Sequence, residues 1–305
     1  MPLRNALERR PWLLLAAALP LQWLSALAAA LWSHGEESLS EPLLLANVSL
    51  AGPLGLVAAY VLAVRLGGVP FAAWTLAVWL ATPWLFVALA LRNYNDTAQD
   101  ALLPLLVGLT ADPEFATGVA VLGGAALLTF PRVEAAVAAG AAFGVAALVV
   151  PATLAFPFAA LLATLVAWRP RRAAALAAAV APFAVVAALR SGFGAEERSY
   201  DALVAALDGF REYFWSKRFL EWLPFAGAFG LARLSLTSAL TLGGGFVGFA
   251  VMQASRADAA FEGARVFVLL LPGLPAYAIL TAALPLLVPT LATRLPAPAA
   301  ADLRL

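Results

Sequence analysis

The segment RSGFGAEERSYDALVAALDGFREYFWSKRFLEWLP, residues 190–224, is the only long stretch of this chain that is polar enough to lie outside a membrane. It holds five of the nineteen Lys and Arg residues and six of the eighteen Asp and Glu residues. The sequence before and after it consists of apolar runs joined by short polar connections. We therefore expect the rest of the chain to form a series of membrane helices.

Residues 200–219 of this segment have the pattern of a helix with one apolar face. The apolar positions lie three to five residues apart, at Leu203, Leu207, Phe210, Phe214 and Phe219. The aromatic cluster at 210–215 is typical of the headgroup layer of a bilayer. We predict that residues 190–219 form an outer-face loop with an amphipathic helix on the membrane surface. This helix could simply tie two spans together, or its Arg and Lys side chains could meet the phosphate of a lipid-linked substrate.

The composition excludes an ordinary soluble domain. Hydrophobic residues make up 63% of the chain and charged residues 12%, whereas typical globular chains carry about 25% charged residues. The chain has no cysteine, which excludes disulfides and thiol catalysis, and its one histidine, His34, makes a His-based metal site improbable. The net charge of +1 gives no indication of nucleic-acid binding. The apolar composition makes a lipid bilayer the expected partner.

Length and apolar runs predict one transmembrane domain over residues 1–305, all-α and polytopic, with about ten helices. We expect an uncleaved first helix rather than a secretory signal, because its apolar run is too long. Residues 102–110 are too short to span and are expected to be re-entrant or interfacial. The glycines at 243–245 allow close helix contact. The predicted helices are 12–32, 43–64, 70–91, 115–130, two short helices within 135–168 meeting near Pro151, 173–189, 219–232, 236–252 and 266–289.

Arginine placement predicts an orientation, because cytoplasmic loops carry an excess of Lys and Arg. With a cytoplasmic N-terminus, eleven cations lie inside and three lie in short outer loops, Arg92, Arg256 and Arg265. We therefore expect a multi-pass plasma-membrane protein with both termini cytoplasmic and residues 291–305 as a cytoplasmic tail. The scarcity of Lys suggests a GC-rich bacterial genome. The inside set is Arg4, Arg9, Arg10, Arg65, Arg132, Arg169, Arg171, Arg172, Arg233, Arg294 and Arg304.

The carboxylates gather in the predicted outer loops. They form four groups: one after the first helix, one after the third helix, one in the long loop and one before the last helix. Such groups could act as a general base toward an acceptor, or could hold a divalent cation against a phosphate. That cation is the one cofactor that these residues suggest. The alternative is that they are solvated loop ends. The P-loop, HExxH, GxSxG and GxGxxG motifs do not occur.

Four stretches, in this order, carry a resemblance to a known family. They are LRNYNDTAQDALLPLLVGLTADPEF (91–115), AAGAAFGVAALVVPATLAFPFAALLATLVAWRPRR (138–172), ALDGFREYFWSKRFLEWLP (206–224) and ARVFVLLLPGLPAYAILTAALPLL (264–287). This layout resembles the polytopic GT-C glycosyltransferases, family 39-like, of the protein O-mannosyltransferase and aminoarabinose-transferase type. The resemblance implies a GT-C fold and a polyprenyl-phosphate-linked sugar as donor on the outer face.

The resemblance also implies site residues. In the family, a long first outer loop supplies the catalytic carboxylate, whereas here that loop is only SHGEESLSEP (33–42). Glu36 and Glu37 are the acidic pair at the corresponding place, and Asp96 or Asp100 matches the second acidic position. The cations facing the lipid phosphate would be Arg265 and either Arg211 or Arg218.

We therefore expect a membrane glycosyltransferase-like protein that transfers a sugar from a polyprenyl-phosphate donor to an acceptor on the outer face. The shortened first loop favours an alternative, a catalytically inactive GT-C-like protein that binds lipid or acts as a scaffold. A small transporter is a weaker alternative, since it should carry polar residues at mid-membrane depth. Gln22 and Gln253 are the exceptions in otherwise apolar helices, and we expect both toward helix ends.

Overall fold

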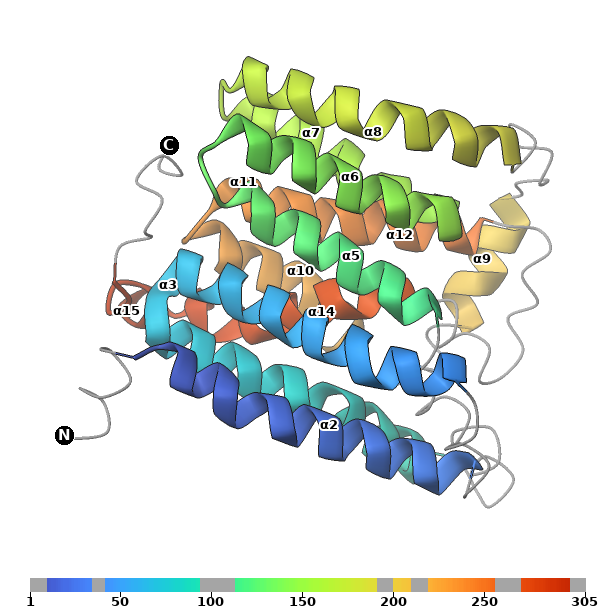
Figure 1. Ribbon diagram of the computed structural model, residues 1–305, viewed down its shortest axis with the longest axis vertical. Helices are drawn as coiled ribbons and strands as arrows, with labels where there is room; N and C mark the ends of the chain where they lie inside the picture. Colours follow the sequence, from blue (N-terminus) through green and yellow to red (C-terminus); the bar gives the residue numbers. More distant parts are fainter. Residues whose placement is uncertain are drawn as a thin grey trace.

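The computed structural model is helical throughout its described residues, which confirms the all-α part of the predicted fold class. The structure describes residues 10–34, 42–93, 113–190, 200–209, 219–255 and 270–296, and no strand occurs among them. Most helices run roughly side by side across the molecule (Figure 1).

The longer helices follow the apolar runs of the sequence. The first part of the chain forms α2 (Trp12–His34), α3 (Pro42–Asn93), α5 (Pro113–Leu128), α6 (Val133–Val149), η3 (Pro151–Leu154), α7 (Ala155–Val166) and α8 (Pro170–Arg190). The second part forms α9 (Tyr200–Gly209), α10 (Phe219–Ala232), α11 (Leu236–Ala239), the π-helical turn η5 (Leu240–Gly244), α12 (Gly245–Ala254), η6 (Leu271–Gly273), α14 (Leu274–Ala282), η7 (Leu284–Leu287) and α15 (Pro289–Ala292).

Helix α3 is two helices joined at a sharp kink. Gly68 has φ 68° and ψ −165°, a conformation that residues with a Cβ rarely adopt. The chain reverses there, so that the parts before and after Gly68 run in opposite directions (Figure 1). The sequence predicted this break at residues 65–68. A Cβ on Gly68 would lie 2.5 Å from Cγ of Pro296, so the C-terminal residues pack against the kink.

Proline and glycine also set the next breaks and contacts. Pro151 ends α6 and begins η3, which confirms the predicted pair of short helices. Gly140 of α6 lies against Ala179 of α8, where an added Cβ would come within 2.6 Å of the alanine Cβ. Gly243 lies similarly close to Ala228 of α10, at 2.8 Å, which confirms the predicted close contact at that glycine run.

The prediction of one continuous helix over 266–289 is wrong for the described residues from 270 onward. That segment is divided into η6, α14, η7 and α15, because Pro272, Pro275, Pro285 and Pro289 each lack the N–H that a continuous helix needs. Residues 270–280 are all buried. The short helix α14 therefore lies inside the bundle, in contact with α3, α5 and α10.

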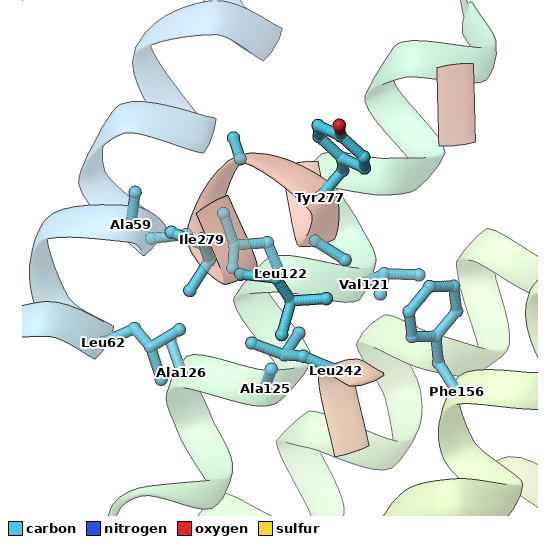
Figure 2. Packing of buried hydrophobic residues seen from close by; sticks show 14 of the residues in the cluster. Ala59, Leu62, Val121, Leu122, Ala125, Ala126, Phe156, Leu242, Tyr277 and Ile279 are labelled. Atoms are coloured by element: carbon cyan, nitrogen blue, oxygen red, sulfur yellow. The ribbon is translucent and has the colours of Figure 1, made fainter. Parts of the chain in front are cut away.

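The core around α14 is apolar. Figure 2 shows side chains of several elements converging there, among them Leu62 from α3, Leu122 from α5, Leu242 from η5 and Ile279 from α14. Each of these four is at most 1% exposed. Dense apolar packing of this kind fixes the helices against one another.

The outer surface is also apolar, as expected for a protein surrounded by lipid. Large side chains such as Phe158, Leu189 and Phe229 are more than 60% exposed. Among the described residues, three helices are long and apolar enough to cross a membrane: Leu50–Thr82, Pro170–Arg190 and Leu236–Ala254. The first of these includes both arms of the kinked α3. The arrangement of ten spans in a GT-C-like fold stays a prediction.

Candidate functional site

The seven residues predicted for catalysis and phosphate binding all lie outside the described residues. They are Glu36, Glu37, Asp96, Asp100, Arg211, Arg218 and Arg265. The predicted interfacial segment 102–110 and most of the predicted tail, from residue 297 onward, also lie outside them.

The described helix ends that flank these residues lie at one end of the bundle, which we call the α9 end. They are the C-terminal ends of α2, α3, α9 and α12 and the N-terminal ends of α3, α5 and α10 (Figure 1). Helix α9 itself begins at Tyr200, where the sequence predicted a helix to begin. The chain therefore approaches and leaves all seven predicted positions from the same end.

Polar side chains of the described residues are also present near the α9 end. Glu114 lies in the first turn of α5, where the helix dipole favours a carboxylate, and its Oε2 atom is buried. One turn later, Gly118 contacts the backbone of Pro272 in η6. Glu114 therefore begins the helix turn that packs against η6.

Gln253 approaches η6 from α12. It is 3% exposed and lies one turn after Phe249, whose ring is 3.0 Å from the position of a Cβ on Gly273. It lies near the end of α12, as the sequence predicted. Glu114 and Gln253 thus place a carboxylate and a buried amide on two helices that both contact η6, and α9 adds the exposed carboxylates of Asp201 and Asp208.

Tyr277 is a buried hydroxyl that sequence reasoning did not single out. It lies in α14, is 3% exposed, and its ring packs on Phe246 with the centroids 5.8 Å apart. The only signal in the sequence was a single aromatic hydroxyl within a run of Leu, Ala and Pro. That signal is weak, because a Tyr in an apolar run is as consistent with packing as with chemistry.

Gln22 does not lie toward a helix end, contrary to expectation. It is the eleventh residue of the 23-residue α2 and is buried. Its Oε1 accepts a hydrogen bond from Trp79 Nε1 at 3.1 Å, and the Trp79 ring lies 6.3 Å from that of Phe115. This hydrogen bond joins α2 to α3 and gives the buried Gln22 side chain a partner. Gln22 therefore gives no indication of a path for ions through the membrane.

The opposite end, which we call the arginine end, is built around the C-terminus of α5. Arg172 Nη2 donates to the carbonyl oxygens of Leu128 at 2.8 Å and Phe130 at 2.6 Å. Arg65 Nη2 donates to the carbonyl of Thr129 at 2.9 Å, and its guanidinium lies 4.3 Å from the centre of the Phe130 ring. The last carbonyls of a helix lack partners within the helix, and the dipole there favours cations. Two of the predicted inside arginines therefore cap a helix.

The two ends of the bundle differ in chemistry, and comparison of the chain with known proteins assigns a function to neither end. Among the described residues no three His, Asp or Glu side chains gather closely enough to hold a metal ion, and the carboxylates predicted to bind a cation lie outside that part of the chain. No protein-family model, curated protein or solved structure matches the chain.

Proposed function

We propose that this chain is a polytopic membrane glycosyltransferase of the GT-C type, which transfers a sugar from a polyprenyl-phosphate donor to an acceptor at the α9 end. One observation supports this most directly. The described helix ends flanking all seven predicted site residues lie at that end, away from the arginine end. The described chain therefore returns to this end before and after each predicted position.

In this proposal the reaction needs a base and a holder for the leaving phosphate. A carboxylate among Glu36, Glu37, Asp96 and Asp100 takes the proton of the acceptor as the bond between the sugar and the phosphate breaks. Arg211, Arg218 and Arg265 stabilise the charge that develops on the polyprenyl phosphate. A divalent cation held by the carboxylates could share that role.

The proposed setting is the plasma membrane, with ten spans and both termini on the cytoplasmic side. The apolar outer surface and the three helices long enough to span support membrane insertion. The arginines at the other end support the orientation, since cytoplasmic ends carry most Lys and Arg. The α9 end would then face the outside, where the lipid-linked donor is presented.

The proposal is tested with purified protein and a fluorescent polyprenyl-phosphate sugar. We expect the donor to bind and free polyprenyl phosphate to be released when an acceptor is present. Glu37→Gln and Asp96→Asn are the diagnostic variants, and at least one of them should abolish release while the protein still binds donor. Glu134→Gln is the matched control, because it removes an exposed carboxylate at the arginine end and should retain full release.

The short first outer loop favours one second candidate, an inactive protein of the same fold that binds lipid or acts as a scaffold. Binding of the donor without release by the unaltered protein would support that candidate. Full release by both variants would contradict the assignment of Glu37 and Asp96, and absence of donor binding would contradict both candidates.

A further inference from the structure

The turn between α7 and α8 holds a tryptophan in a strained conformation. Trp168 is the one non-glycine residue with positive φ, 51°, among the residues that the structure describes. Its N–H donates to the carbonyl of Leu165 at 2.9 Å, and the N–H of Arg169 donates to that of Thr164 at 3.0 Å. These two bonds define a Schellman motif that ends α7, and glycine is the usual residue at the position of Trp168.

The packing of the turn does not explain this residue. Trp168 is 89% exposed, so its ring contributes little to the core. A large side chain held in a left-handed conformation at full exposure is costly in two ways, through backbone strain and through contact of the ring with water. An exposed residue under strain indicates a role outside the fold itself.

Three arginines lie in this turn, in the first turn of α8 and in the connection between α5 and α6. Arg169 and Arg171 follow Trp168, and Arg132 lies two residues after Phe130, whose carbonyl Arg172 binds. Unlike Arg65 and Arg172, the side chains of these three make no hydrogen bond or ion pair with any residue in the described ranges. Arg132 and Arg171 are exposed, and Arg169 is half-buried.

Exposed apolar side chains continue from the turn along the adjoining helices. Leu162, Leu165 and Val166 of α7 and Val133 and Val137 of α6 are each more than 40% exposed. An apolar helix surface thus ends at turns that carry an indole and three guanidinium groups, which have no partner among the described residues. These side chains suit the boundary of a leaflet, because indole prefers the interface and guanidinium groups attract the headgroup phosphates.

We infer that Trp168, Arg132, Arg169 and Arg171 form a binding surface for the headgroup of an anionic phospholipid. The indole lies at the interface, and the guanidinium groups donate hydrogen bonds to the phosphate oxygens. This inference goes beyond the proposed transferase function, because it concerns the opposite end of the bundle and does not involve the sugar donor.

The test is native mass spectrometry of the full chain released from detergent, titrated with phosphatidylglycerol or phosphatidylcholine. The unaltered protein should bind phosphatidylglycerol more tightly. Each arginine near an anionic headgroup contributes about a fivefold gain in affinity. The variant Arg169→Gln with Arg171→Gln should therefore weaken phosphatidylglycerol binding by about 25-fold. Arg190→Gln is the matched control, since it removes an exposed arginine at the α9 end and should leave this binding unchanged.

Trp168→Gly separates the lipid role from folding, because glycine suits the left-handed position. This variant should bind phosphatidylglycerol more weakly while its melting temperature stays the same or rises. The inference would be overturned if the double arginine variant bound phosphatidylglycerol as tightly as Arg190→Gln does. Equal affinity of the unaltered protein for both lipids, or unchanged binding by Trp168→Gly, would also overturn it.

Discussion

Arg171 and Arg172 are neighbours in the sequence but have different surroundings in the structure. Arg172 is buried and donates to two carbonyl oxygens at the end of α5, whereas Arg171 is exposed. The positive-inside rule weights both residues equally, because it counts loop charges without regard to contacts. The sequence could therefore predict the side on which the arginines lie, but not which of them cap a helix.

We predict that Arg172→Gln lowers the free energy of unfolding by about 1.5–3 kcal/mol, the usual contribution of a hydrogen bond from a charged donor, because both carbonyls share one nitrogen, Nη2. Arg171→Gln should change it by less than about 0.5 kcal/mol, as is usual for exposed positions. Thermal unfolding in detergent, followed by circular dichroism, compares the two. Equal losses in both variants would contradict the capping role of Arg172.

Trp168→Gly is expected to raise the free energy of unfolding by about 0.5–1 kcal/mol. Glycine removes the strain of the left-handed conformation, which costs a residue with a Cβ about 1–2 kcal/mol. Its greater freedom in the unfolded chain offsets about 0.5–1 kcal/mol of that gain in stability. The same unfolding experiment measures the difference. A clear loss of stability would mean that the Trp168 ring supports the turn.

At the scale of elements, the breaks set by single residues and the close contact at Gly243 were predictable, whereas the contacts around α14 were not. Gly68 and Pro151 interrupt apolar runs, and the structure breaks at both. The four prolines between 272 and 289 carry the same signal, yet we predicted one helix there, because the apolar run through them was long enough to span. The burial of α14 depends on α3, α5 and α10, which lie far away in the sequence.

Helix α10 approaches the end of α14 through two glycines. A Cβ on Gly227 would overlap the carbonyl oxygen of Leu280, and one on Gly230 would overlap that of Ala283. The backbones touch here because neither glycine has a side chain. Trp74 of α3 closes the same end of α14, where its Nε1 donates to the carbonyl of Ala282 at 2.9 Å. Helices α3 and α10 thus both contact the backbone at the end of α14.

We predict that Gly227→Ala destabilises the protein by about 1–3 kcal/mol, because overpacking against a backbone atom forces the helices apart. Gly123→Ala in α5 is the matched control, since a Cβ there would have no neighbour within 4 Å. The control should be stabilised by about 0.5–1 kcal/mol, the usual advantage of alanine over glycine within a helix. Unfolding of both variants side by side is the measurement, and a gain in stability for Gly227→Ala would contradict the close approach.

At the scale of the whole molecule, the bundle has two ends of different chemistry. The described turns at the arginine end contain Arg65, Arg132, Arg169, Arg171 and Arg172, and the helix ends that flank the predicted site residues lie at the other end (Figure 1). The alternation of apolar runs and charged connections was enough to predict this separation. Individual site residues could not be tested in the same way, because their assignment depends on a resemblance and the seven lie outside the described residues.

Membrane insertion with the two ends on opposite sides is the central claim, and labelling of single cysteines tests it most directly. The chain has no native cysteine, so each introduced thiol reports one position. Tyr200→Cys at the α9 end and Arg132→Cys at the arginine end are both exposed sites. On intact cells a membrane-impermeant maleimide should label Tyr200→Cys, and Arg132→Cys should be labelled only after permeabilisation. Labelling of both positions on intact cells, or of neither until the cells are permeabilised, would contradict the claim.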